Sequence, residues 1–242
     1  MQLNKKTVKV KIQKRYKRFL ADVELEDGSL TTVHVPNTGR MTTCWAPGWD
    51  CIISDSENTN RKYRFTLEMT HNGNTWIVVN TNIPNAIAED FIRNKKIPTL
   101  ENYDTVRREV KYGENSRIDL LLENEDEKCF VEVKNTTLVE GEIAYFPDAP
   151  SDRAIKHLKE LEREVAKGNR AVMLYLITRE DAKSFSPANH IDPRYGKAVI
   201  RAMKNGVEII PVMCNVSPSE ICFNGVLSLK SFHGVIGINH VS

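Results

Sequence analysis

Two stretches, Ser116-Arg117-Ile118-Asp119-Leu120-Leu121-Leu122 and Cys129-Phe130-Val131-Glu132-Val133-Lys134, decide the fold of this chain. Each is expected to form a short strand, and the polar turn 123–128 joins the two strands into a hairpin. Both are apolar enough for a core, yet they carry Asp119, Glu132 and Lys134. A buried charge costs several kcal/mol unless it is paired or bound to a metal. The presence of these charges in apolar strands therefore requires a structural or functional explanation.

Glu132 and Lys134 are two residues apart, so their side chains lie on the same face of their strand. If Asp119 lies on the neighbouring strand, two carboxylates and one ammonium group converge. That set is sufficient to bind Mg²⁺ or Mn²⁺ and attack a phosphodiester. We predict that Asp119 and Glu132 are metal ligands, helped by the carbonyl of Val133, and that Lys134 orients the attacking water or stabilises developing charge. Taken alone, the pattern fits charges exposed to solvent better than it fits a metal site.

Charged residues near this hairpin are further candidates. Glu109, on the preceding strand, is a candidate catalytic carboxylate, and Asp90, on the preceding helix, is another. For both, a surface role is the competing interpretation. The basic residues that could contact a phosphate backbone here, or else form a solvated surface, are Arg107, Arg108, Lys111, Lys156 and His157.

Composition excludes several classes of protein. The 242 residues are 40% apolar and carry a net charge of +2. The five cysteines form no C-x-x-C pair, which argues against a zinc site and a disulfide framework. No long apolar run or signal peptide is recognised, so we expect a cytoplasmic protein without a membrane partner.

The charge is distributed unevenly. Basic residues crowd the segment from Lys5 to Arg18, and no acidic residue occurs before Asp22. Interleaved aromatic residues suit a polyanion-binding surface, but lysines also protect the exposed edge of a sheet. The loop from Asn37 to Met41 similarly fits either a phosphate contact or a simple turn. The candidate polyanion contacts in these two segments are Lys14, Arg15, Tyr16, Lys17, Arg18, Asn37, Thr38 and Arg40.

Residues 1–82 are predicted to form a small β-barrel, OB-like in the first instance, with a sandwich as the alternative. Turn signals occur at Asp27-Gly28 and Asn72-Gly73. The expected strands are Val8–Lys14, Phe19–Leu25, Leu30–His34, Asp50–Ser54, Tyr63–Thr70 and Trp76–Val79.

Residues 83–242 are predicted to form an α/β domain with a partly parallel sheet flanked by helices. A helix over 83–96 precedes three antiparallel strands, and the Ser151 N-cap opens a second helix that stops at Gly168. The later expected elements are strand Ala171–Thr178, helix Pro193–Asn205 and strand Val207–Met213. The apolar segment 231–242 either docks on the body or extends from it.

This order of elements is similar to the PD-(D/E)XK nuclease core, in which two strands bend apart and open a cleft for charged side chains. The nuclease signature has proline before its aspartate, whereas Ile118 stands here. Because proline is not a ligand, this departure leaves the metal site intact.

The chain also resembles the SfsA family, the sugar fermentation stimulation protein homologues, from about Val10 to Leu229. The motifs that carry the resemblance are Lys14 to Val23, Pro36 to Gly39, Arg108 to Gly113, Ser116 to Asp119, Val131 to Asn135, Phe146 to Ala149, Lys156 to Leu158 and Gly206 to Ile209.

This resemblance implies an OB-like barrel followed by a PD-(D/E)XK-like domain, DNA binding without sequence preference and a link to maltose use. It therefore favours polyanion binding for the basic N-terminal segment. A helix-turn-helix proposed for the family is not expected here, because Val207 to Met213 is too rich in strand formers for a recognition helix.

Three functions remain open at this point. The chain is a DNA-binding protein with an Mg²⁺ or Mn²⁺ site that cleaves phosphodiesters, or a catalytically silent DNA-binding regulator of sugar metabolism genes. A small-ligand regulator is the third, although the chain has no Gly-rich phosphate loop. The sequence leaves the oligomeric state open, a homodimer included.

Overall fold

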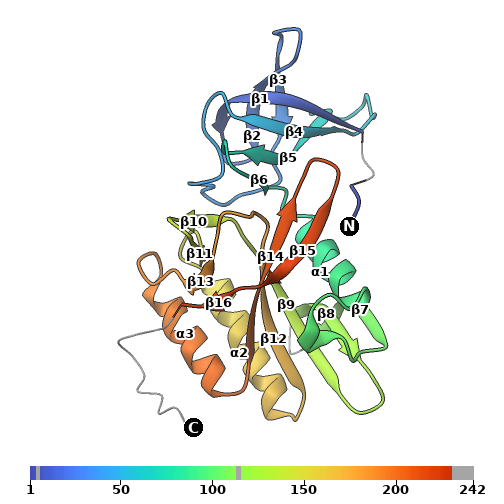
Figure 1. The fold of residues 1–242 in the computed structure, drawn as a ribbon, viewed down its shortest axis with the longest axis vertical. Coiled ribbons are helices and arrows are strands. Elements are labelled where there is room, and N and C mark those ends of the chain that lie inside the picture. The colour runs from blue at the N-terminus through green and yellow to red at the C-terminus, as the bar shows by residue number, and fades with distance from the viewer. Residues whose placement is uncertain (4–5, 113–115, 231–242) are drawn as a thin grey trace.

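The structure is a computed structural model that describes residues 1–3, 6–112 and 116–230. Lys5, Gly113 and the segment 231–242, which entered the predictions above, lie outside the described residues. The chain folds into a barrel and a larger α/β unit that lie end to end (Figure 1).

The N-terminal unit is a six-stranded sheet that closes into a barrel. Its strand order is β3-β2-β1-β4-β5-β6, and a parallel pairing of His34 with Thr66 joins β3 to β5. Gly28 and Gly73 have φ of 80° and 94°, as the two turn signals require. The strands are β1 (Thr7–Tyr16), β2 (Leu20–Glu24), β3 (Leu30–His34), β4 (Asp50–Asp55), β5 (Phe65–His71) and β6 (Trp76–Val78).

The second unit contains the predicted hairpin and the predicted helices. Ser151 caps its helix through Ala154 N, at 3.1 Å, and Gly168 follows the helix with φ 88°. Its first elements are α1 (Pro84–Arg93), a 3₁₀ turn (Pro98–Leu100), β7 (Thr105–Tyr112), β8 (Ser116–Glu123) and β9 (Lys128–Thr136). The later ones are α2 (Asp152–Ala166), β12 (Arg170–Ile177), α3 (Pro193–Lys204), β14 (Glu208–Val216) and β15 (Ile221–Val226).

The main sheet has the order β15-β14-β12-β9-β8-β7. Strands β7, β8 and β9 are antiparallel, whereas β9, β12 and β14 run parallel, so the predicted mixed sheet is confirmed. The region Ala198 to Ser217 is the end of α3 followed by β14, and no helix-turn-helix forms there.

Helices cover both faces of this sheet. On one face α1 packs Ile87, Phe91 and Ile92 against buried residues of β8, β9 and β12. On the other, α2 and α3 pack side by side, with Leu158, Leu161 and Val199 in the core (Figure 1). The central strand β12 is buried along nearly its whole length, which explains its continuous apolar sequence.

A second sheet in this unit was not predicted. It has the order β10-β11-β13-β16 and consists of β10 (Leu138–Glu140), β11 (Ile143–Phe146), β13 (Ser184–Pro187) and β16 (Ser228–Leu229). Strands of two to four residues carry too little alternation to be recognised in a sequence.

The barrel and the α/β unit are joined by direct contacts. Val78 N donates to Thr178 O at 3.1 Å, and the buried Arg179 donates to the carbonyls of Thr43 and Thr137. The N-terminus contributes as well, because Met1 N donates to Ile221 O at 2.7 Å. The barrel is therefore anchored at the carboxyl ends of the parallel strands.

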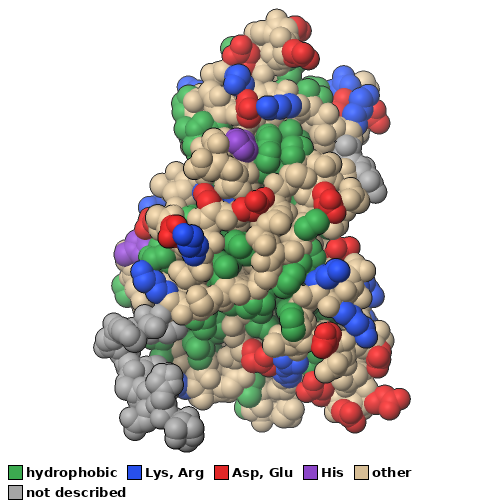
Figure 2. Space-filling model, viewed as in Figure 1, with side chains coloured by type: hydrophobic (Ala, Val, Ile, Leu, Met, Phe, Trp, Pro, Cys, Tyr) green, Lys and Arg blue, Asp and Glu red, His purple; other side chains and the backbone are tan. Residues whose placement is uncertain are grey.

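On the face shown in Figure 2, Lys and Arg side chains lie among Asp and Glu side chains and form no extended field of one sign. Within the described ranges, no helix is both long enough and apolar enough to cross a membrane. All five cysteines are free thiols.

Candidate metal and phosphodiester site

The predicted hairpin opens at Asp119. The pairing of β8 with β9 runs from Glu123↔Lys128 to Leu120↔Val131 and stops there, so the next two positions are Asp119 and Glu132. In place of a backbone partner, Val133 N donates to Oδ2 of Asp119 at 2.8 Å. The carboxylate thus occupies the gap where the two strands separate.

The neighbouring strand is distorted at the same level. In the β7–β8 ladder, Arg108 pairs with Leu120 and Val110 with Ile118, and the position between them, Glu109 opposite Asp119, is unpaired. Glu109 has φ 51°, a left-handed conformation that is costly for a residue with a side chain.

The distortion also changes which face of the sheet each residue joins. Before it, Val106 packs on the α1 side, whereas Tyr112, beyond it, packs on the α2 side. On β8, Leu120 likewise packs on the α1 side and Ile118 on the α2 side. Regular alternation would keep each of these even-numbered pairs on one face. The break therefore lies at Glu109 and Asp119, beside the charged cluster.

Asp119 is held from two sides. Its Oδ1 accepts a hydrogen bond from Nδ2 of Asn85, at the start of α1, at 2.8 Å. Burial, together with the negative charge of Glu132, raises the pKa of Asp119 to about 6. The carboxyl group therefore changes charge close to neutral pH.

Glu132 is 2% exposed and lies on the α2 side of the sheet. Its Oε1 accepts from Nζ of Lys134 at 2.6 Å and contacts Nδ1 of His157. Burial opposes ionisation of Glu132, but Lys134 and His157 outweigh it and hold the pKa of this carboxyl below its ordinary value. Glu132 is thus ionised in the range where Asp119 titrates.

His157 connects the cluster to α2. Arg153 Nε donates to Nε2 of His157 at 3.4 Å, while Nδ1 of His157 contacts Glu132 and lies 3.2 Å from Nζ of Lys134. The sequence prediction placed His157 at a phosphate, whereas the structure places it 8% exposed against a carboxylate.

The residues present fit a divalent ion in one important respect. Oε2 of Glu132 is buried and has no hydrogen-bond partner within the described part of the chain, and a buried acceptor without a partner is costly. Asp119 and Glu132 provide hard oxygen ligands of the type that Mg²⁺ prefers. The described residues contain no group of three or more His, Cys, Asp or Glu side chains suited to a metal. Any ion here would therefore need water or substrate oxygens as well.

Two other candidate carboxylates lie apart from these contacts. Glu109 is exposed, although it occupies the strand position opposite Asp119. Asp90 forms an ion pair with the Met1 amino group at 3.4 Å. Only Glu109 keeps a position from which it could act in this site.

The basic residues around the site differ in whether an acidic side chain already lies beside them. Arg107 pairs with Glu123 at 2.6 Å, Arg108 lies 3.7 Å from Glu89, and Lys156 lies 3.5 Å from the buried Glu160. Lys111 is exposed.

The basic N-terminal segment divides into two kinds of residue. Lys14, Lys17 and Arg18 are exposed, whereas Arg15 turns inward and donates to the carbonyls of Arg18, Asn37, Gly39 and Arg40. Burial lowers the pKa of Arg15, yet a guanidinium remains charged at neutral pH. Tyr16 donates to Asp22 at 2.9 Å.

The loop after β3 is held against the α/β unit. Asn37 is buried and donates to Val79 O at 3.0 Å, while its Oδ1 accepts from Gly39 N at 2.9 Å. Arg40 N donates to Oδ2 of Asp148 at 3.1 Å. Thr38 and the Arg40 side chain are exposed, so they are the groups of this loop open to a ligand.

Sequence reasoning missed Asn85 and Arg153, which fix Asp119 and His157. Asn85 gave no signal, because it is a polar residue in a first helical turn. Arg153 precedes His157 by four residues, a spacing that brings helical side chains together and could have identified it.

Comparison with known proteins agrees with this architecture. The family model described as "SfsA N-terminal OB domain" matches residues 14–79, and "Sugar fermentation stimulation protein RE domain" matches residues 82–220. A sugar fermentation stimulation protein homolog of Geotalea uraniireducens is 46% identical over 217 residues, 90% of this chain and 94% of that protein. One from Pelobacter propionicus is 50% identical over 208 residues, 86% of this chain and 90% of that protein.

A solved structure is also similar. It is titled as Pyrococcus furiosus SfsA in complex with Ca²⁺, and it matches with a TM-score of 0.85 and 28% identity over 96% of this chain and 98% of that one. The fold is thus that of a two-domain protein in which an OB barrel precedes a mixed-sheet α/β domain. The chain belongs to the SfsA family of sugar fermentation stimulation proteins.

Proposed function

We propose that this protein binds DNA and hydrolyses phosphodiester bonds, in the manner of PD-(D/E)XK nucleases, at the cluster of Asp119, Glu132 and Lys134. The observation that carries the proposal is the convergence of these groups where β8 and β9 separate, with Oε2 of Glu132 buried and lacking a partner among the described residues. Such a charged cluster in a core is costly unless it serves a function.

Asp119 and Glu132 would hold a divalent ion, Mg²⁺ or Mn²⁺. Mg²⁺ sites in enzymes acting on phosphates use one or two carboxylates and complete their coordination with waters and substrate oxygens. The Ca²⁺ named with the Pyrococcus furiosus relative is another hard cation that takes oxygen ligands. When bound, the ion would neutralise phosphate charge and make a water more acidic.

The protein's own groups have separable roles in this proposal. Val133 N and Asn85 fix the orientation of Asp119, and the His157 contact to Oε1 leaves Oε2 of Glu132 for the ion. Lys134, which is 13% exposed in its side chain, would donate to the attacking water or to the oxygen on which negative charge develops. Glu109 is the additional carboxylate, acting from the exposed side.

DNA would be held by exposed cations on both units. Lys14, Lys17, Arg18 and Lys111 are exposed and are the first candidates among the predicted contacts. Because phosphate contacts carry no sequence information, this surface suits binding without sequence preference. Arg15 would support it indirectly by holding the loop 37–40.

The decisive experiment incubates supercoiled plasmid and single-stranded DNA with the purified protein and Mg²⁺ or Mn²⁺, with EDTA as a control. Wild type should cleave, and Glu132→Gln and Lys134→Met should each lose at least about a hundredfold in rate, in the range of removing one charged catalytic group. Glu142→Gln changes an exposed carboxylate elsewhere and should cleave like wild type. Equal cleavage by wild type and Glu132→Gln would contradict the proposal.

A catalytically silent DNA-binding regulator of sugar metabolism genes is the second candidate. It is favoured by the engagement of Oε1 of Glu132 with Lys134 and His157, and by the names of the relatives. It predicts salt-dependent DNA binding with no cleavage under any metal. The same plasmid assay, run beside a binding titration, separates the two candidates.

A further inference from the structure

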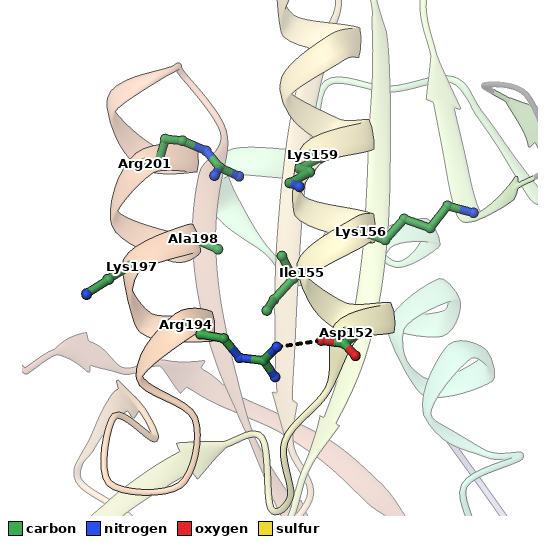
Figure 3. Close-up of a pocket in the computed structure, with 8 residues that line it drawn as sticks. All are labelled: Asp152, Ile155, Lys156, Lys159, Arg194, Lys197, Ala198 and Arg201. Carbon is green, nitrogen blue, oxygen red and sulfur yellow. Dashed lines mark hydrogen bonds and ion pairs between the residues drawn. The ribbon is translucent and has the colours of Figure 1, made fainter.

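A hollow of about 660 Å³ lies between α2 and α3, on the outer side of the two helices. Ile155 and Ala198 form its floor, and the basic residues around it are Lys156, Lys159, Arg194, Lys197 and Arg201 (Figure 3). Among the described residues, Asp152 is the one carboxylate that lines it. The lining therefore has a strong excess of positive charge.

Some of these charges are already neutralised. Arg194 reaches across one end to Asp152 at 2.9 Å, as Figure 3 shows, and Arg201 pairs with Glu162 at 3.0 Å. Lys159 and Lys197 are exposed and have no acidic partner within 4.0 Å among the described residues. These two ammonium groups are therefore available to a ligand.

The hollow continues along the helices. A second one, of about 580 Å³, shares Lys159 and Arg201 with the first and adds Arg163. Each helix carries a row of basic residues spaced three and four apart: 156, 159 and 163 on α2, and 194, 197 and 201 on α3. This spacing places each row along one side of its helix. Each row spans about 10 Å, enough for about three successive phosphates of a DNA strand.

We propose that the groove formed by these two hollows between α2 and α3 binds the phosphate backbone of DNA, as a contact separate from the cluster of Asp119 and Glu132. The inference rests on the proposed DNA-binding function and extends it to a second surface. Helix α2 connects the two, because it presents His157 to Glu132 and Lys159 to the groove. A strand held in the groove would gain affinity without contributing to the chemistry, since phosphate contacts position rather than specify.

The test compares two double variants with the same change of charge. Lys159→Gln with Lys197→Gln neutralises the unpaired lysines of the groove. Lys95→Gln with Lys96→Gln neutralises two exposed lysines that follow α1. Binding of fluorescent duplex and single-stranded oligonucleotides is measured by anisotropy at several salt concentrations, without divalent metal.

The groove variant should bind at least about fivefold more weakly at 0.1 M salt, and its plot of log K against log salt should be flatter by about two. The control variant should stay within about twofold of wild type, with an unchanged slope. If the two variants bind alike while wild type binds DNA, the groove inference is overturned and the proposed function stands. If wild type binds no DNA, the proposed function fails as well.

A second probe separates DNA from an acidic protein partner. If the groove variant loses binding to fluorescent polyglutamate while its DNA binding is unchanged, the groove serves a different ligand and the inference is overturned. Because all four lysines are exposed, both variants should melt close to wild type, which circular dichroism checks.

Discussion

Glu109 lies opposite Asp119 in the β7–β8 ladder, at the position where pairing is interrupted and the backbone of Glu109 is left-handed. Strain of this kind is typical of functional sites, where the surroundings enforce it. Here it coincides with the change of face along β7 and β8 and with the end of the pairing between β8 and β9.

Glu109→Gly should therefore stabilise the fold, by up to about 1 kcal/mol, because glycine adopts φ 51° without steric cost. Glu109→Gln keeps the strained backbone and should leave stability unchanged. Urea denaturation measures both. If Glu109 is a catalytic carboxylate, both variants lose cleavage, whereas a strain-only role predicts that Glu109→Gln remains active. A loss of stability in Glu109→Gly would contradict the assignment of strain.

Asp119 is expected to have a structural role that an amide can replace. Asp119→Ala leaves Val133 N without its acceptor and should destabilise the fold by about 1 to 3 kcal/mol. Asp119→Asn retains an oxygen acceptor and should lose less, while both variants lose the metal ligand. Chemical denaturation in EDTA separates stability from metal binding, and equal destabilisation by the two variants would argue against the hydrogen bond.

Metal affinity should depend on pH through Asp119. With a pKa of about 6 for Asp119, and with Glu132 remaining ionised, protons compete with the metal below that value. Mn²⁺ binding measured by calorimetry should be about tenfold weaker at pH 5 than at pH 7.5. In Asp119→Asn this dependence should disappear, and a wild type whose affinity is flat over this range would count against the assignment.

Without metal, the stability of the fold should depend on pH through Asp119 as well, but in the opposite direction to metal affinity. Because the folded protein holds the Asp119 proton more tightly than the unfolded chain, the contribution of this residue to the free energy of unfolding falls as pH rises between about 4 and 6. Thermal melts of wild type and Asp119→Asn in EDTA, compared at pH 5 and pH 7.5, isolate this contribution. A wild type that gains no stability relative to Asp119→Asn at pH 5 would refute it.

Two adjacent basic residues should behave differently. Arg15→Gln removes a donor shared by several carbonyls of the barrel and should cost about 2 kcal/mol of stability. Lys14→Gln changes an exposed residue and should stay within about 0.5 kcal/mol of wild type, while weakening DNA binding at low salt. Denaturation and anisotropy on the same preparations check both, and a stable Arg15→Gln would show that the loop 37–40 does not depend on it.

Gly39 permits a close approach between the barrel and the α/β unit. A Cβ there would lie 2.6 Å from Oδ2 of Asp148 and 3.0 Å from Oδ1 of Asn37, so Gly39→Ala should destabilise the fold by about 1 to 3 kcal/mol. Asp148→Ala in the same chain should recover part of that loss, because it removes the nearest atom. A double-mutant cycle measures the coupling, and strictly additive effects would mean that the loop avoids the contact by moving.

Much of the fold was predictable because its larger elements carry strong patterns. The apolar run of β12, the N-cap at Ser151 and the turns at Gly28 and Gly73 each have a direct physical cause that a sequence displays. The short strands β10, β11, β13 and β16 carry no such pattern, and their pairing depends on contacts with distant segments.

Part of the candidate site was also predictable from the sequence. Asp119, Glu132 and Lys134 were found because charges in apolar strands are anomalous, and the structure brings them together. The inward turn of Arg15 and the His157 contact were not predictable, because both depend on which way a side chain points after the tertiary fold has formed. Their roles in DNA binding or catalysis remain predictions.

The contacts between the barrel and the sheet have a consequence for how the molecule melts. Ile52, Met69 and Val78 of the barrel belong to the same apolar cluster as α1 and the main sheet, and β6 bonds directly to the segment after β12. Separating the two halves would expose that cluster to water, so neither half gains by unfolding first. Calorimetry should then record one cooperative transition for the whole chain, and a fragment ending after the barrel should be prone to aggregate.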